Sequence, residues 1–247
     1  MKKLIILILI LQFNPLFSQD SLIVVDYDRT SNWVKMYNTL PYLSKDERDR
    51  LSYAYGKNEG WTEKYIMELK GNESFYFIDE NYVNDKYQWS DRKETYKIFR
   101  NFTTYTQSSL IETIGKTYHI EGEINPYKWK ILTEIKEVNG YVCMKAETKD
   151  TTKNQTIIAW FTDQIPVPTG PELFEGLPGL ILEIDINDGA IIIEAKNITK
   201  KSPTTNFTIP KKWKGKKVTQ TEYSGIVDKY VKECIKNNRN PYWAIRY

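Results

Sequence analysis

Histidine and cysteine are scarce in this sequence, which has one histidine and two cysteines among 247 residues. A structural zinc site needs four closely spaced ligands of these types, and His119, Cys143 and Cys234 stand far apart, so we expect no metal site. His119 and Cys143 could form a nucleophile–base pair, but no thiol-protease motif surrounds either residue. We therefore interpret His119 as an ordinary strand residue and assign no catalytic residue and no cofactor.

An excess of charge of one sign is also lacking. The net charge is +3, and it becomes +1 once Lys2 and Lys3 are set aside with the leader described next. Binding to nucleic acid depends on a strong positive field, so a chain this close to neutrality is not expected to bind it. The short basic run Pro210–Lys217 is accordingly interpreted as a solvated loop.

Long hydrophobic runs are missing beyond the amino terminus. Lys2 and Lys3 precede an apolar run from Leu4 to Leu11, and Ser18 is a small residue suited to cleavage. These features predict a signal peptide over residues 1–18, with cleavage after Ser18 or Gln19. The remaining residues, 19–247, would form a single domain without a transmembrane segment, located in the periplasm or secreted.

Export to an oxidising compartment would permit a disulfide between Cys143 and Cys234. The strand pattern places Cys143 on a charged face, whereas Cys234 lies on the apolar side of a helix. Both the bonded and the free forms remain open at this point.

Alternating apolar residues indicate strands along most of the chain. We expect them at 22–27, 64–70, 75–78, 96–99, 110–113, 117–121, 127–138, 141–148, 158–161, 180–186 and 191–195. The clearest hairpin turns at Asn139–Gly140, the preferred pair for a type I′ turn. Its predicted pairs are Val138 with Tyr141, Ile135 with Met144, Glu134 with Lys145 and Thr133 with Ala146.

Helices are few. Ser44 and Glu47 have the spacing of a capping box and predict a helix over 44–52. Apolar residues from Ile226 to Ile235 recur with helical spacing and predict an amphipathic C-terminal helix. The expected fold is mainly β: a long curved antiparallel sheet, open and half-barrel-like, with one or two helices covering its concave side.

Proline and glycine are concentrated between two apolar runs, in the segment Ile158–Ile186. We expect Gly176 and Gly179 to need a positive φ or a backbone contact that a Cβ would block. The loop either bends one edge of the sheet or forms the rim of a binding mouth. In the second interpretation the rim residues are Trp160, Phe161, Pro166, Gly170, Pro171, Phe174, Gly176, Leu177, Pro178 and Gly179.

The hexapeptide GLPGLI at Gly176–Ile181 resembles the signature of the GLPGLI family of secreted bacterial proteins. The upstream motifs WKI, GYVCMKA, AWF with an IP pair, and GP follow in the family's order over residues 129–186. The sequence departs from the family at Glu172 and Glu175, where an aromatic and a small residue are common. The resemblance implies an envelope protein and carries no established activity.

Abundant aromatic residues beside few catalytic groups favour a non-enzymatic binding or carrier protein of the bacterial envelope. Its ligand would be an apolar small molecule, a lipid chain or an extended peptide. One alternative is a hydrolase that uses Glu172, Glu175 or Asp163; it requires two of these carboxylates to converge in a cleft with separated pKa values. The other alternative is an interaction module for an outer-membrane protein partner, which an exposed apolar patch or open sheet edge would favour.

Overall fold

The computed structural model describes residues 21–56, 60–82, 95–202 and 212–247, so the predicted signal peptide lies outside the described residues. Its strands are β1 (Leu22–Ser31), β2 (Trp61–Lys70), β3 (Glu73–Ile78), β4 (Tyr96–Asn101), β5 (Thr106–Thr113), β6 (Lys116–Glu123), β7 (Lys130–Val138), β8 (Tyr141–Asp150), β9 (Gln155–Thr162), β10 (Leu180–Ile186), β11 (Ile191–Lys201) and β12 (Lys216–Val218). Its helices are α1 (Trp33–Asn38), α2 (Lys45–Tyr55), α3 (Gln220–Lys236) and the short 3-10 helix η1 (Pro241–Trp243).

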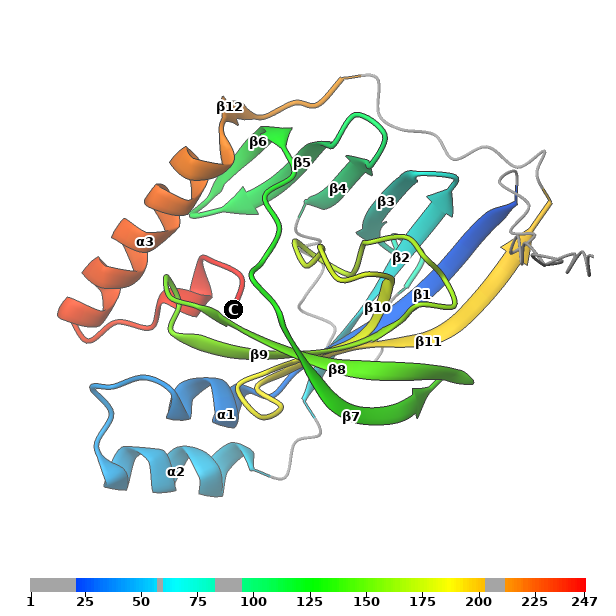
Figure 1. The fold of residues 1–247 in the computed structure, drawn as a ribbon. Coiled ribbons are helices and arrows are strands. Elements are labelled where there is room, and N and C mark those ends of the chain that lie inside the picture. The colour runs from blue at the N-terminus through cyan, green and yellow to red at the C-terminus, as the bar shows by residue number, and fades with distance from the viewer. Residues whose placement is uncertain (1–20, 57–59, 83–94, 203–211) are drawn as a thin grey trace, which may run out of the picture.

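These strands form one open sheet in the order β12-β6-β5-β4-β3-β2-β1-β11-β10-β9-β8-β7 (Figure 1). Strand β1 pairs with β2 on one side and with β11 on the other, so two meanders meet at β1. All pairings are antiparallel except that of β12 with β6, which is parallel. The expected curved, open, mainly β sheet is confirmed, although the short parallel edge makes it mixed.

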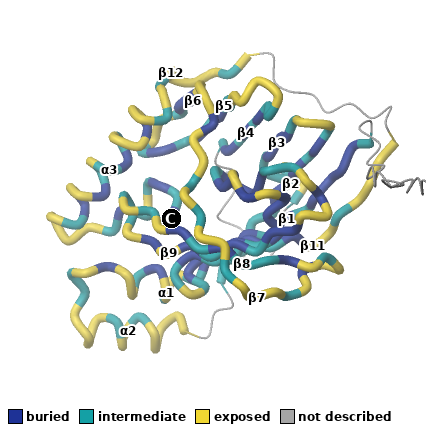
Figure 2. The backbone as a smooth tube through the Cα atoms, viewed as in Figure 1, coloured by how far each residue is buried: buried dark blue, intermediate teal, exposed yellow. Residues whose placement is uncertain are grey.

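The core lies on the concave side of this sheet. Alternate residues along many of the strands are buried there, for example Tyr65, Met67 and Leu69 on β2. Figure 2 shows buried backbone along the strands, whereas α2 and many of the turns are exposed. Because strand residues alternate between the two faces, burial on one face decides the register.

The β7–β8 hairpin confirms the predicted turn and corrects one of its pairs. Asn139 and Gly140 both have positive φ, and the Lys145 ammonium lies 3.1 Å from Glu134 Oε1 as expected. Ala146 pairs with Ile131 instead of Thr133, because an irregularity between Ile131 and Ile135 shifts the register. The predicted pairs of Val138 with Tyr141 and Ile135 with Met144 are confirmed.

The predicted helices are present, with one difference in their placement. Ser44 and Glu47 form the expected capping box at the start of α2, and the C-terminal helix α3 buries Tyr223 and Val227. Helix α3 packs beside β6 at one end of the sheet (Figure 1). Much of the concave side is covered by the loop between β9 and β10, in addition to the helix predicted to cover it (Figure 1).

Candidate functional site

The Pro/Gly loop, residues 163–179, runs between β9 and β10 and folds over the concave face of the sheet (Figure 1). It is tied to the strand that follows it: the Ile181 amide donates to the Thr169 carbonyl at 2.9 Å, and the Leu180 amide donates to the Ile165 carbonyl at 3.0 Å. A single β-bridge joins Thr169 to Glu175. The loop therefore has a defined backbone path inside the curved sheet.

Two glycines make this path sterically accessible. Gly176 has φ +92° and Gly179 has φ +155°. A Cβ on Gly176 would lie 2.5 Å from the Pro126 Cβ, and a Cβ on Gly179 would overlap the Thr162 carbonyl oxygen. The prediction for both glycines is confirmed, and Leu180, which follows directly, is fully buried.

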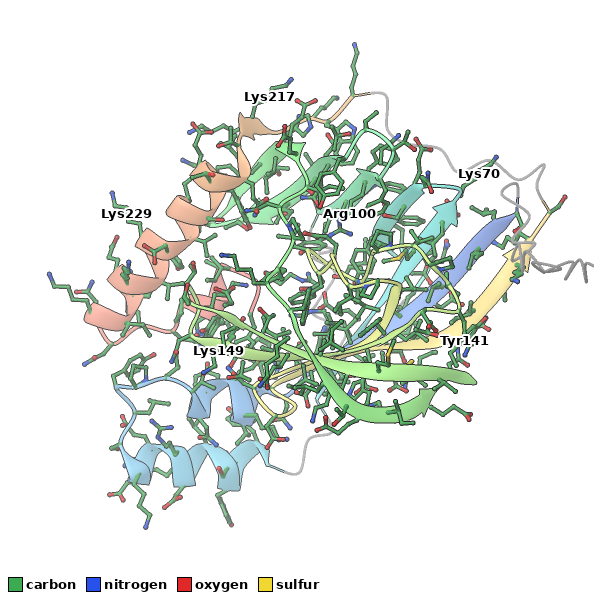
Figure 3. All side chains as sticks on the ribbon, in the orientation of Figure 1. Lys70, Arg100, Tyr141, Lys149, Lys217 and Lys229 are labelled. Atoms are coloured by element: carbon green, nitrogen blue, oxygen red, sulfur yellow. The ribbon has the colours of Figure 1, made fainter. Side chains whose placement is uncertain are left out.

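Arg100 on β4 anchors the loop to the sheet. Its Nη1 donates to the Thr169 hydroxyl at 3.2 Å and to the Gly170 carbonyl at 3.3 Å, and its Nη2 donates to the Glu172 carbonyl at 2.6 Å. The same Nη2 lies 3.1 Å from Glu175 Oε2. Arg100 is fully buried in the middle of the molecule (Figure 3). A buried guanidinium is sustained there because the loop supplies both acceptors and a counter-charge.

Glu172 is held by two further arginines. Arg29 Nε from β1 and Arg246 Nε from the C-terminal segment both lie 2.7 Å from Glu172 Oε1. Arg29 also lies 3.1 Å from Glu63 Oε2, and Arg246 Nη2 donates to the Tyr65 hydroxyl at 2.7 Å. The loop carboxylate thus links two distant parts of the chain.

The two loop glutamates have opposite electrostatic environments. Burial would raise the pKa of Glu172, but the adjacent Arg246 and Arg29 outweigh burial and lower the pKa to about 2. Burial raises the pKa of Glu175 to about 7, and Arg100 offsets that rise only in part. At neutral pH Glu172 is therefore ionised, whereas Glu175 exists in both protonation states.

A cavity of about 310 Å³ lies against this network. It is bounded by strand ends, the β8–β9 turn, the loop, α3 and the C-terminal residues. Its lining consists of Tyr96, Gln107, Glu123, Asn125, Pro126, Tyr127, Lys149, Asp150, Thr151, Thr152, Lys153, Gln155, Ile157, Glu172, Leu173, Phe174, Glu175, Gln220, Tyr223, Ser224, Val227, Ile245, Arg246 and Tyr247. Exposed residues such as Asn125, Lys149 and Ser224 form its mouth, whereas Glu172, Glu175 and Gln155 are buried in its wall.

Several polar groups of this lining have unused hydrogen-bonding capacity. Six buried side-chain atoms in the described ranges have no hydrogen-bond partner, and three belong to lining residues: Gln155 Nε2, Glu175 Oε2 and Gln220 Oε1. Because Glu175 Oε2 has the Arg100 guanidinium as an ionic partner, the two glutamine atoms are the ones with unused capacity. A buried polar atom left unpaired costs about 1–3 kcal/mol, so such a cluster favours occupancy by a polar molecule.

Lys153 adds a positive charge to the cavity. It lies in the turn between β8 and β9, where its backbone amide donates to Asp150 at 3.1 Å. Its ammonium makes no hydrogen bond or ion pair with the part of the chain that the structure describes. Burial lowers the pKa of Lys153, while Asp150 and Glu172 act in the opposite direction.

The structure separates most of the predicted rim residues from this cavity. Among the ten, only Phe174 lines it. Phe161 is fully buried in the core, and Phe174 packs on Tyr127 with ring centroids 5.4 Å apart. Trp160 points to the opposite face, where the Lys136 ammonium lies 4.5 Å from its ring. Adjacent strand residues face opposite sides, so Trp160 and Phe161 cannot converge on one mouth.

The sequence did carry a signal for the missed arginines. Arg100 follows Tyr96 and Ile98 on the buried face of β4, and Arg29 follows Tyr27 on that of β1. A basic residue on the apolar face of a strand indicates a buried counter-charge. That rule identifies Arg29 and Arg100, but it does not identify the glutamates that they meet.

Cys143 and Cys234 are both free and buried. The Cys143 thiol lies near the Tyr141 carbonyl, and Cys234 belongs to the last turn of α3 near Tyr230. Figure 3 labels Tyr141 at the side of the molecule opposite α3. The disulfide is absent from this structure, because the two cysteines belong to distant elements.

His119 makes local contacts on the outer face of β6. Its Nε2 lies 2.9 Å from the Ser108 hydroxyl, and its ring stacks on Trp213 with centroids 5.7 Å apart. Within the described ranges no three His, Cys, Asp or Glu side chains are grouped as metal ligands, and no helix has the length and apolar character needed to cross a membrane.

Comparison with known proteins gives a partial family match. The model of a family described as protein of unknown function (Porph_ging) matches residues 147–183. This region runs from β8 through the Pro/Gly loop into β10 and includes the GLPGLI hexapeptide. No curated protein sequence matches the chain.

Two solved structures of a protein called PNGF-II resemble the fold. The C2 crystal form has a TM-score of 0.54 and 14% identity, and the likeness covers 84% of this chain and 32% of that protein. The P21 form has a TM-score of 0.52 and 14% identity, with 84% and 33% covered. The chain thus spans about a third of PNGF-II, and at this identity the likeness concerns the fold alone.

Proposed function

We propose that this protein is a non-enzymatic binding protein that holds a small polar solute in the cavity beside the Pro/Gly loop. The observation that carries this proposal is the cavity of about 310 Å³ whose lining includes two glutamines, Gln155 and Gln220, each with an unpartnered buried polar atom. Binding sites combine concave shape with a few well-placed polar groups, and this volume is at the lower end of their usual range.

A polar ligand fits this lining better than the apolar ligand, lipid chain or peptide expected from composition. Two of the three aromatic residues proposed for the rim lie elsewhere: Phe161 is buried in the core and Trp160 lies on the other face of the sheet. The cavity lining includes apolar residues such as Ile157, Leu173 and Val227, but also tyrosines, amides and charged side chains. Such groups exchange hydrogen bonds with a polar solute, whereas a lipid chain would leave them unpaired.

A carboxylate-dependent hydrolase is less well supported, although Glu172 and Glu175 do line one cavity with separated pKa values. Asp163, the third acid considered, does not line it. A carboxylate with a pKa of about 2 is a weak base at neutral pH. Glu172 Oε1 is also engaged by Arg29 and Arg246, so this carboxylate is better suited to holding the loop in place.

The interaction alternative has an open sheet edge at β7. Ile131 and Ile135 are 51% and 68% exposed on this strand. Lys130 and Glu134 are also exposed there, and charged side chains on an edge strand commonly protect it from pairing with another chain. The polar cavity is therefore the stronger basis for a function.

The proposed location is the bacterial envelope, in the periplasm or secreted. Support comes from the amino-terminal signal pattern and from the GLPGLI motif, which we interpret as membership of the GLPGLI family. The short family match at residues 147–183 covers this motif. Amino-terminal sequencing of the exported protein tests the location, and a mature chain that retains Met1 would contradict it.

A blocked mouth tests the binding function. Ser224 is exposed and lines the cavity, whereas Thr221 is exposed on the same helix and does not line it. Each protein is purified from its native envelope and denatured, and the small molecules that it releases are identified. A polar solute should be released by the wild type and by Thr221→Trp. The same solute should be missing from Ser224→Trp. Equal release from all three proteins, or release of lipid alone, would contradict the proposal.

A further inference from the structure

The cavity wall contains a cation that its surroundings do not neutralise. Lys153 lines the cavity, and its ammonium pairs with no group in the described residues. The neighbouring acid Asp150 is engaged by the turn, because its Oδ1 accepts the backbone amides of Thr152 and Lys153 at 2.8 and 3.1 Å. An ammonium that lines a cavity without a counter-ion would be stabilised by an anion at this position.

The nearby carboxylates are already committed to other cations. Glu172 is shared by Arg29 and Arg246, and Glu175 is paired with Arg100. At the mouth, Glu123 and Lys149 are exposed charges of opposite sign, and solvent screens both of them.

A second group on the same wall complements the ammonium. Gln155, two residues after Lys153, is 3% exposed and lines the cavity, and its amide has a nitrogen without a partner. An ammonium and an amide on the same wall can contact a carboxylate and the polar group next to it. The volume suits a small solute with one charged end.

We propose that the solute held in this cavity carries a carboxylate and that Lys153 is the side chain that pairs with it. The inference rests on the proposed binding function and adds the chemical class of the ligand. Lysine suits this role because its ammonium is a compact point charge with three donors.

Pairs of probes that differ only in charge test the inference. Glutamate and glutamine form one such pair, and glucuronate and glucuronamide form another. Binding of each probe is measured by ligand-observed NMR and calorimetry for the wild type, Lys153→Gln, Lys153→Arg and Lys229→Gln. Lys229 provides the control because it is an exposed lysine on α3 that does not line the cavity.

At least one carboxylate should bind the wild type more tightly than its amide, and Lys153→Gln should weaken that carboxylate by roughly tenfold or more. Binding of the amide should change little, Lys153→Arg should retain much of the preference for the carboxylate, and Lys229→Gln should behave as the wild type. Unfolding midpoints establish that all variants are folded.

The outcomes separate this inference from the binding function. Equal binding of carboxylate and amide, or an equal loss of both in Lys153→Gln, would overturn the role of Lys153 while leaving the polar cavity in place. Binding of no probe to the wild type, together with no release of solute from native protein, would overturn both proposals.

Discussion

The guanidinium of Arg100 donates to the backbone carbonyl of Glu172 at 2.6 Å, across 72 positions of the sequence. This bond joins the fourth strand of the sheet to the Pro/Gly loop, and the same guanidinium meets the Glu175 carboxylate at 3.1 Å. The shape of the loop, and therefore the wall of the cavity, depends on a charge buried under it.

Replacing Arg100 with Met should destabilise the protein by about 3–5 kcal/mol, because the loop carbonyls and Glu175 lose their partner inside the core. Urea unfolding measures this change. Lys97→Met on the same strand is the control, since its ion pair with Glu80 is partly exposed and should contribute less than about 1 kcal/mol. Similar losses for the two variants would contradict an anchoring role for Arg100.

Replacing a glycine with alanine should have opposite effects on stability in the Pro/Gly loop and in helix α3. Gly179→Ala should cost roughly 3 kcal/mol, because φ is +155° and the new Cβ would overlap the Thr162 carbonyl oxygen. Gly225→Ala in α3 has no atom within 4 Å of the new Cβ and should stabilise the helix by about 0.5–1 kcal/mol. The unfolding midpoints of the two variants check the expected loss of stability for Gly179→Ala and the expected gain for Gly225→Ala. An unchanged midpoint for Gly179→Ala would show that the loop relaxes to accept the new Cβ.

Glu175 should make stability fall as the pH rises. Its pKa is about 7 in the folded protein against an ordinary value of 4.5, because burial penalises the ionised form. Folding therefore favours the protonated carboxyl; its contribution is complete below about pH 4.5 and is lost as the pH rises through about 7.

The comparison with Glu175→Gln isolates this effect, since the variant cannot ionise at that position. Between pH 4.5 and 7.5 the free energy of unfolding of the wild type should fall by up to roughly 3 kcal/mol relative to that of the variant, as the shift in pKa implies. Denaturant unfolding at a series of pH values measures the difference, and a constant difference over this range would argue against the buried proton.

Thiol counting should find two free cysteines per chain in denaturant without reductant, because neither Cys143 nor Cys234 is bonded. In the native protein Cys143 should react slowly, since burial raises the pKa of its thiol to about 11 and little thiolate is present at neutral pH. Absence of free thiols in denaturant would restore the disulfide predicted as one alternative from the export signal.

Local sequence patterns predicted the structure correctly wherever residues close together in the sequence determine it. The Asn139–Gly140 turn specifies its own geometry, and the capping box of Ser44 and Glu47 starts α2 as expected. The hairpin register was correct beside the turn and failed beyond Ile135, where an irregularity shifts the pairing. Such an irregularity depends on packing across the sheet, which alternation along one strand does not encode.

The site was less predictable because its parts come from distant segments. Gly176 and Gly179 were identified correctly from their surroundings, but nine of the ten rim residues do not line the cavity. The cavity lining contains aromatic residues such as Tyr127 and Phe174, as the composition suggested, but it also contains Lys153, in a turn that the sequence does not distinguish. Alternation along a strand predicts which face of the sheet a residue occupies. It does not predict which distant residue packs against that face.

The sequence alone determined the class of fold, the turns and helix starts, and the two glycines that allow the loop to bend. These properties depend on backbone angles and on hydrophobic periodicity over a few residues. Only the tertiary structure decided that Arg29, Arg100 and Arg246 meet Glu172 and Glu175, and that Lys153 borders the resulting cavity. Charge pairs between distant segments depend on the curved sheet that brings them together, because the energy of each pair depends on distance and burial that no local pattern contains.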